Sequence, residues 1–485
     1  MAKAAFLADP QNAYKGRVWL QVLVGAGQLV AAREVADDLA RRFPSDAQLW
    51  SQLGYLAYMQ KDFKGAQAAF ARAQDGDDWT AEQRQNLCFA EADSASSAGD
   101  AAGAVAALRK LGDNPTPAIR LKIGRAQLAA HDRRAAVQTA RRVMAETHSD
   151  LEYENAEALL EEALQPGSDP RGDKQLNLGY AYLRQHDDVA GLAAFERGFA
   201  FGNGKAFHYA DAAYAAKRVS DNATAIAFFR FALDLNEREQ TFTPQRVFGF
   251  RREIEVMERH WGVLLGSPYH AGTLDVWQAG VEAYWQPPVI GFRDGRILQF
   301  FARGYENFRN GSNGPIGFPT LQETVGLRYK PLATQNIALT AERLMAVGRL
   351  ALNDWLFRVG YSTGDGTDLR IDRADWASWQ IYGEANYYLG AKRLLIGTEV
   401  RYGVTLPLPR RGRLTLYPHA LIAAEFDSSA VEKLVDAAGA GLSIRLWFGE
   451  DRYHAPPGWL EINGQYRFAD AERGQGPGLR ATLSL

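Results

Sequence analysis

Three segments in the C-terminal half of the chain alternate strictly between apolar and polar residues. The clearest covers 376–389, and the same alternation recurs over 393–402 and 460–468. Successive side chains of a β-strand point to opposite faces, so each segment predicts a strand with one apolar and one polar face. A half-buried sheet of a water-soluble protein gives the same pattern. The length and number of the segments, and the charges spaced along the polar face, favour a transmembrane β-barrel around a polar lumen.

The predicted barrel domain covers 256–485 and contains about twelve antiparallel strands, an even number as barrel closure usually gives. Some connections between the strands are tight. Others are long and polar, namely Asn310–Gly317, Gly364–Asp375 and Asp451–Gly458. We expect short and long connections to alternate, as periplasmic turns and external loops do in such barrels.

The preceding residues, 1–240, are Ala-rich with helical periodicity, and they repeat. One copy of the repeat has Gly54, Ala57 and Phe70 in the positions of a tetratricopeptide (TPR) motif, and a second lies 34 residues before a third in the region 175–232. Five to six repeats predict an α-solenoid whose concave face binds a partner, or alternatively a spacer or plug. We expect 241–255 to be a linker between the solenoid and the barrel.

If the apolar face of each strand meets lipid, the polar face lines the lumen. This face carries aromatic rings together with hydroxyl, amide and guanidinium groups. Rings stack on sugars while the polar groups exchange hydrogen bonds with them, so such a lumen suits a sliding polysaccharide. The alternative is a lumen filled by structural salt bridges with no transport role. The predicted polymer-guiding residues are Glu282, Arg303, Arg328, Glu342, Arg358, Tyr382, Glu384, Glu399, Arg401, Arg445, Trp459, Glu461 and Arg467.

Composition narrows the function classes. A formal net charge of −2 gives no reason to expect nucleic acid as a partner. Most of the tryptophans and tyrosines lie in the second half, where interfacial aromatic girdles would need them. The one cysteine, Cys88, is expected to be a small core residue.

No run of apolar residues is long enough for a transmembrane helix. The segment Val18–Ala32 comes nearest, but it fits the helical repeat better than it fits a signal-peptide core. The export signal that a barrel needs is therefore expected to be missing or to lie upstream of Met1.

Catalytic motifs are not apparent. The chain has no Gly-x-Ser-x-Gly elbow and no phosphate-binding loop, and the histidines of the helical half lack metal-ligand spacing. The aspartates of Gly364–Asp375 lack the ligand spacing of a calcium loop and predict an acidic external loop. We therefore expect no enzyme activity, no cofactor and no metal.

Helical repeats followed by a barrel resemble the outer-membrane exporters of bacterial exopolysaccharides, of the cellulose and poly-N-acetylglucosamine porin types. A closer resemblance is carried by Pro-Leu-Ala-Thr-Gln-Asn at 331–336, Ala-Glu-Arg-Leu at 341–344, Asp-Trp-Leu at 354–356 and Asp-Trp-Ala-Ser-Trp-Gln-Ile-Tyr at 375–382. These motifs are similar to the C-terminal domain of the NfrA-type bacteriophage adsorption protein A, over roughly 321–485. The chain differs from that family in being short, with fewer repeats.

The resemblance implies a bacterial outer-membrane protein with its N-terminal domain in the periplasm. Its partners would be outer-membrane lipid, an exopolysaccharide chain, an inner-membrane glycosyltransferase, and a bacteriophage tail protein that uses it as a receptor. The alternative is a non-conducting outer-membrane receptor or scaffold whose loops and TPR surface bind partners.

Overall fold

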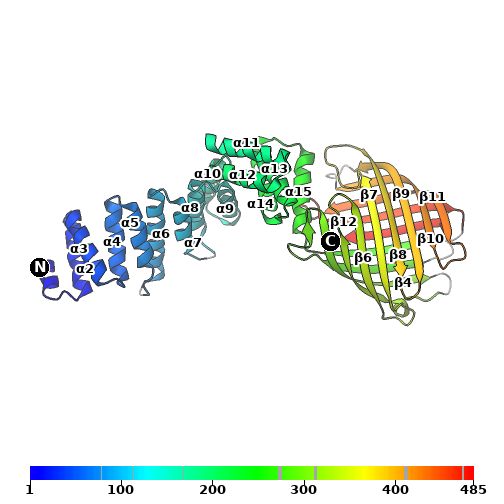
Figure 1. The fold of residues 1–485 in the computed structure, drawn as a ribbon, viewed down its shortest axis with the longest axis horizontal. Coiled ribbons are helices and arrows are strands. Elements are labelled where there is room, and N and C mark those ends of the chain that lie inside the picture. The colour runs from blue at the N-terminus through cyan, green and yellow to red at the C-terminus, as the bar shows by residue number, and fades with distance from the viewer. Residues whose placement is uncertain are drawn as a thin grey trace. The chain divides into compact units, whose positions relative to one another are not determined.

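The computed structural model describes all of residues 1–485 except 78, 113, 166, 168, 271–275, 311–313, 409–412 and 472–473. The chain divides into two compact units. The first consists of Met1–Leu178 and Ala194–Gly204, and the second of Gly179–Ala193 and Lys205–Leu485. Fifteen helices precede the strands in the described residues, and Figure 1 labels most of them.

The first unit is built from paired antiparallel helices. It contains α1 (Ala2–Leu7), α2 (Ala13–Gly25), α3 (Leu29–Arg42), α4 (Ala47–Met59), α5 (Phe63–Ala73), α6 (Ala81–Ser97), α7 (Ala101–Arg109), α8 (Pro117–Ala129), α9 (Arg133–Glu146) and α10 (Asp150–Ala163). Helices α11 (Pro170–Arg184) and α12 (Asp188–Ala200) contribute residues to both units. None of the helices in the described part of the chain is long and apolar enough to cross a membrane.

The TPR motif explains how the helices of a pair pack. A Cβ atom added to Gly54 of α4 would lie 2.7 Å from the ring of Phe70 in α5, so glycine is needed for the ring to approach. Phe70 itself is 1% exposed, and Ala57 and Ala66 are fully buried beside it. The predicted TPR-like helical domain is confirmed.

A short turn joins the two helices of a pair, and it recurs along the chain. One residue takes a left-handed conformation, and the aspartate that follows accepts a hydrogen bond from the backbone of the next helix. The pairs are Lys61–Asp62, Gly99–Asp100, His131–Asp132, His186–Asp187 and Ser220–Asp221. Two of the isolated histidines therefore occupy turn positions.

The second unit contains α13 (Ala206–Arg218), α14 (Asn222–Glu239) and α15 (Pro244–Glu258). Residues 241–255, for which the sequence predicts a linker, lie mostly in α15. Thr243 caps this helix by accepting a hydrogen bond from the backbone of Arg246, and Pro244 occupies its first turn. Phe248 and Phe250 are buried on it, so α15 is a packed element rather than a tether.

The strands close into a barrel. In the described residues these are β1 (Trp261–His270), β2 (Val276–Trp285), β4 (Arg296–Asn310), β5 (Gln322–Lys330), β6 (Asn336–Ala346), β7 (Asp354–Asp365), β8 (Trp376–Tyr388), β9 (Arg393–Pro407), β10 (Leu414–Asp427), β11 (Leu434–Phe448), β12 (Gly458–Ala469) and β13 (Gly476–Ser484). All neighbours pair antiparallel, and the β1–β13 and β2–β4 pairs complete the ring. The two-residue β3 (Phe292–Arg293) only extends a hairpin with β4. The predicted antiparallel barrel of about twelve strands is confirmed.

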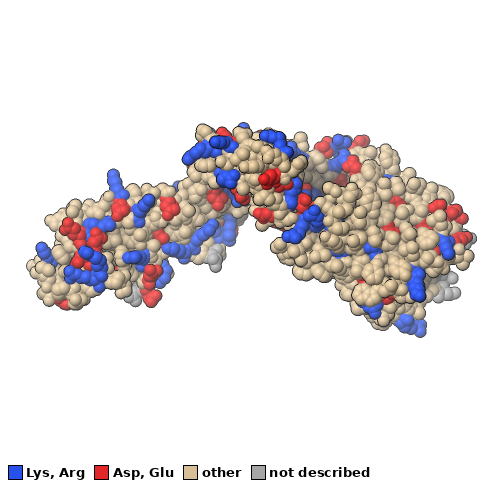
Figure 2. Space-filling model, in the orientation of Figure 1, with Lys and Arg blue, Asp and Glu red and all other residues tan. Residues whose placement is uncertain are grey.

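The two faces of the barrel wall differ in chemistry. Buried polar side chains, such as Thr324, Glu342 and Ser378, share the inner face by register. The outer face carries exposed apolar side chains; on β7, Trp355 and Phe357 are 46% and 45% exposed. Over the barrel wall, Figure 2 shows mostly uncharged atoms.

Connection lengths do not alternate between the two ends of the barrel. We call the end at which β1 begins the proximal end and the other the distal end. Gly364–Asp375 and Asp451–Gly458 both lie at the proximal end, whereas Asn310–Gly317, of which 311–313 are outside the described residues, lies at the distal end. The expectation of alternating lengths is wrong, because two long proximal connections pack on α15.

Candidate functional site

The barrel interior holds the side chains that the sequence singles out. The register places all thirteen predicted polymer-guiding residues on the inner face, and each contacts another polar or aromatic group there. They form three groups: a row across β2 and β4–β8, a cluster on β9 and β12, and a group at the proximal mouth.

The row across β2 and β4–β8 is here named the charge ladder, and ion pairs link its members in the order Arg328, Glu282, Arg303, Glu342, Arg358 and Glu384. At one end, Glu282 accepts from Arg303 at 2.6 Å and from Arg328 at 2.8 Å. At the other, Arg358 lies 3.4 Å from Glu384, whose carboxylate also accepts from the hydroxyl of Tyr382 at 2.5 Å.

Glu342 is the central carboxylate of the charge ladder. It is 1% exposed, and it lies 3.6 Å from Arg303 and 3.3 Å from Arg358. A buried carboxylate is tolerated only when cations compensate the lost hydration. The ladder therefore neutralises itself, three carboxylates against three guanidinium groups, and it ties neighbouring strands together.

The cluster on β9 and β12 involves a fourth residue that sequence analysis missed. Arg467 donates to Glu399 at 2.6 Å and to Glu425 of β10 at 3.0 Å, and Arg401 also pairs with Glu399. Glu425 lies on the inner face of β10. The alternation of β10 could have revealed it, but the apolar residues Leu421 and Ala423 on the same face weaken that signal.

At the proximal mouth, a guanidinium group lies against two tryptophans. Arg445 donates to Glu461 at 2.7 Å and to the backbone oxygen of Thr367 at 3.0 Å. Its guanidinium carbon lies 5.1 Å from the ring centre of Trp447 and 4.9 Å from that of Trp459. These cation–π contacts hold the two rings at the inner rim.

Five buried side chains close over this rim, and we name them the mouth core. They are Phe248, Leu369, Trp376, Trp447 and Ala455, each at most 6% exposed. The two tryptophans are inward-facing residues at the proximal strand ends, whereas Phe248 comes from α15 and the other two come from connections. Sequence analysis missed this core because its members meet only in the tertiary structure.

Polar contacts surround the mouth core. Arg252 of α15 binds both carboxylate oxygens of Asp368, at 2.9 and 3.0 Å, and donates to the backbone oxygen of Pro456 at 2.8 Å. Arg251 donates to the backbone oxygens of Asp451 and His454. Helix α15 is thus fixed to the β7–β8 connection and to the β11–β12 connection.

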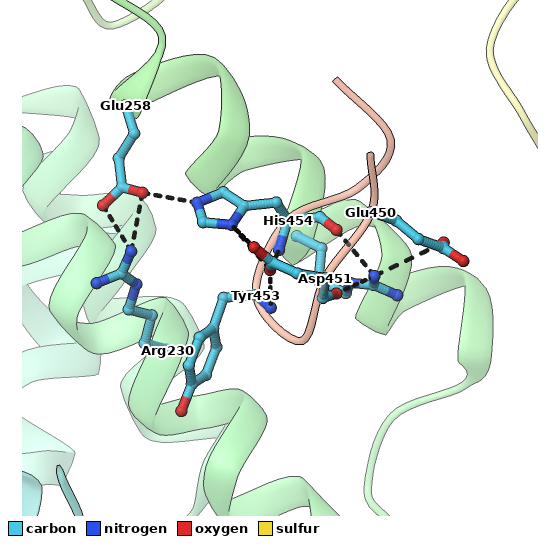
Figure 3. Close-up of polar contacts among 7 residues, drawn as sticks. Arg230, Glu258, Glu450, Asp451, Tyr453 and His454 are labelled. Carbon is cyan, nitrogen blue, oxygen red and sulfur yellow. Dashed lines mark hydrogen bonds and ion pairs between the residues drawn. The ribbon is translucent and has the colours of Figure 1, made fainter. Parts of the chain in front are cut away.

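His454 has a carboxylate at each ring nitrogen (Figure 3). Nε2 lies 2.7 Å from Glu258 of α15, and Nδ1 lies 2.7 Å from one oxygen of Asp451. Arg230 of α14 pairs with Glu258 from the other side at 2.8 Å. Burial alone would lower the pKa of His454, but its hydrogen bonds to Glu258 and Asp451 outweigh that cost and raise the pKa.

The spaces beside these groups are small. A cavity of about 180 Å³ borders the charge ladder between Arg358 and Tyr382. A second, of about 40 Å³, lies beneath the mouth core and is lined by Arg401 and Tyr417. Within the described residues, no three His, Cys, Asp or Glu side chains are grouped to hold a metal ion.

Part of the barrel matches a known protein family. Residues 313–482 match the model of the family described as "Bacteriophage N adsorption protein A C-term". Residues 313–482 are therefore similar to the C-terminal domain of NfrA-type adsorption proteins. This match confirms the resemblance found in the sequence motifs, and it extends over most of the barrel strands, from β5 to β13. No curated protein matches the chain.

Several solved structures show a distant likeness to the chain. YrrB, a TPR protein with an unusual peptide-binding site, is 14% identical over 41% of this chain and 90% of its own, with a TM-score of 0.25. A TPR protein from Parabacteroides merdae ATCC 43184 is 13% identical over 50% of this chain and 98% of its own, at 0.27. The COG4313 outer membrane channel from Pseudomonas putida F1 is 10% identical over 46% of this chain and 94% of its own, at 0.29.

Proposed function

We propose that this NfrA-type protein resides in the bacterial outer membrane and exports an exopolysaccharide through its barrel. The TPR-like domain, in the periplasm, recruits the polymer or an inner-membrane glycosyltransferase, and the distal connections serve a bacteriophage tail protein as a receptor. The observation that carries the membrane part of the proposal is the chemistry of the outer wall.

Exposed aromatic side chains lie in two rows on the outer wall, the proximal row on β1, β2, β4, β5 and β7–β9 and the distal row on β2, β4, β7, β8 and β12. The proximal row is Trp261, Trp285, Phe300, Tyr329, Tyr361, Trp379 and Tyr402, and the distal row is Trp277, Phe308, Trp355, Tyr387 and Phe468. On β2, eight residues of about 3.3 Å each separate Trp277 from Trp285, and a tilt of about 40° leaves roughly 20 Å between the rows. That height approaches the apolar band of outer-membrane barrels, so the rows fit interfacial girdles.

The interior supports a polar polymer as cargo. The charge ladder contains equal numbers of carboxylates and guanidinium groups, so the wall neither traps nor repels a chain of one charge. Sugar hydroxyl groups can exchange with the hydrogen bonds of Arg358 and Glu384, and the rings of Tyr382 and Trp459 offer stacking faces. Family membership of the barrel supports the phage role, since the family is described by adsorption.

The second candidate is a non-conducting receptor or scaffold. Two observations favour it: the carboxylates of the charge ladder are neutralised by its own guanidinium groups, and the mouth core covers the rim with buried side chains. In this function the barrel is an anchor, and its distal connections and TPR surface bind partners.

The test uses the full chain refolded into detergent. A closed barrel should migrate differently on a denaturing gel before and after boiling, and it should remain in the membrane fraction after mixing with lipid vesicles. Solubility in plain buffer with no mobility shift would refute the membrane assignment. Conductance in planar bilayers then separates the candidates: export requires an open state whose current changes in E399Q and R401Q, whereas a scaffold stays closed in both variants.

A further inference from the structure

We propose that the connection between β11 and β12, residues 449–457, is a proton-operated latch that holds α15 across the proximal mouth of the barrel. The latch itself follows from the contacts at the mouth. Its consequence for passage through the barrel rests on the proposed export function.

The latch connection contributes both to the mouth core and to the polar contacts that surround it. Ala455 is fully buried in the mouth core beside Phe248. The backbone oxygens of Pro456 and Pro457 accept from Arg252 and Arg259 of α15, at 2.8 and 2.9 Å. The connection therefore occupies the space between α15 and the strand ends, and α15 cannot leave the mouth while these contacts persist.

His454 makes this docking depend on protonation. Its ring nitrogens both face carboxylates, Glu258 on α15 and Asp451 on its own connection, as Figure 3 shows. A ring nitrogen contributes a hydrogen to such a contact only when it is protonated, and only the imidazolium form has hydrogens on both nitrogens. In the neutral form, one ring nitrogen directs a lone pair at a carboxylate oxygen.

Other charged groups face the same junction from each element packed there. Arg230 on α14 pairs with Glu258, and Tyr453 lies over Arg230 and donates to Asp234 at 2.8 Å. The charged groups at the junction are Arg230, Asp234 and Glu237 on α14, Arg251, Arg252, Glu255, Glu258 and Arg259 on α15, Glu450, Asp451 and Arg452 on the latch connection, and Asp368 and Arg413 on neighbouring connections. Among the side-chain types at this junction, histidine is the one whose reference pKa, about 6.5, lies between pH 5.5 and 8.5.

The sign of the pH dependence follows from the geometry. Contact with two carboxylates favours the imidazolium, so the docked histidine has a higher pKa than the free one, near 6.5. Docking is strongest below the free value and weakens as pH rises through the docked value. The latch therefore holds at acid pH and loosens at alkaline pH.

Thiol labelling of the full chain in detergent tests the latch. In a C88S background, Ala455→Cys reports on the buried position. Val431→Cys, at a fully exposed position of the distal connection between β10 and β11, corrects for the pH dependence of the reagent. We expect A455C labelling, divided by V431C labelling, to rise severalfold between pH 5.5 and pH 8.5, because docking weakens as the pH rises through the pKa of docked His454.

Two further variants make the result specific. Adding H454Q, which cannot be protonated, should remove the pH dependence and give high labelling at both values, while E258Q should reduce the rise. A normalised labelling ratio that stays flat in the A455C protein, or that rises equally with H454Q, would overturn the latch. Bilayer currents at the same pH values separate the two proposals: a labelling rise without current in any variant keeps the latch and refutes export.

Discussion

Replacing Glu342 by glutamine tests whether the charge ladder stabilises the barrel. The substitution keeps the size of the side chain and its ability to accept a hydrogen bond, but it removes the negative charge between Arg303 and Arg358. Both guanidinium groups are less than one-third exposed, so solvent screens them only in part.

The magnitude follows from the distances. At 3.3 Å, with an effective dielectric constant of about 20, one ion pair is worth about 5 kcal/mol before the cost of dehydration. Breaking a buried pair typically costs about 3–5 kcal/mol, a similar size, because a charge is left without compensation. Here Arg303 keeps Glu282 at 2.6 Å and Arg358 keeps Glu384 at 3.4 Å. We therefore expect a loss at the lower end, about 3 kcal/mol in the free energy of unfolding.

The assay is urea unfolding of the full chain in lipid vesicles, followed by tryptophan fluorescence. E323Q is the matched control: Glu323 lies on the adjacent strand β5, on its exposed outer face, and this change should stay within about 0.5 kcal/mol. Combining E342Q with R358Q in a double-mutant cycle should give a coupling of about 1–3 kcal/mol. A loss below about 1 kcal/mol for E342Q, equal to that of the control, would refute the structural role of the ladder.

Three further changes probe the outer wall, the helical packing and the turns. Phe357→Arg places a charge on the outer wall and should cost about 2–4 kcal/mol in vesicles, with F357L as the control; near-neutral behaviour would argue against lipid contact. Gly54→Ala should lower the free energy of unfolding by about 1–3 kcal/mol, because the added Cβ would meet Phe70. Gly25→Ala, with open space around it, should be neutral or stabilising by up to about 1 kcal/mol. Thermal unfolding that ranks the two variants in the reverse order would contradict the packing argument. Asp221→Ala removes the cap of α14 and should lower the free energy of unfolding by about 1 kcal/mol, whereas D221N should retain most of the stability. Helical circular dichroism on heating measures both variants, and equal losses would exclude capping as the cause.

The strands were predictable because their information is local. Alternation with period two fixes which residues share a face, so the inner position of Glu342 or Arg401 follows from its neighbours alone. The TPR repeats were predictable for a similar reason, since glycine and phenylalanine recur at fixed spacing. The segment 241–255 carries no comparable pattern: Gly249 and its aromatic neighbours look like a change of fold, yet Thr243 and Pro244 start a helix.

The mouth was beyond sequence reasoning because its contacts join distant parts of the chain. Arg252 meets Asp368, 116 residues later, and Glu258 meets His454, 196 residues later. Arg252 and His454 do not stand out in the sequence, because Arg252 is an arginine in a charged helix and His454 is a lone histidine in a loop. The same limit applies to Glu425, whose partner Arg467 is two strands away.

The distribution of bonds indicates which part of the barrel can change shape. The charge ladder joins side chains on adjacent or nearby strands whose backbones are already paired, so breaking it would release no segment. At the mouth, by contrast, guanidinium groups of α15 bind backbone oxygens in connections, and these carbonyls can be taken over by water when the connection moves away. Opening at the mouth would therefore expose the buried side chains of the mouth core and break the contacts of His454 in the latch. The strand pairing of the barrel wall would stay intact. A barrel that opens in this way needs no change of strand register. Substitutions in the charge ladder should therefore affect the stability of the wall, whereas substitutions at the mouth should affect opening.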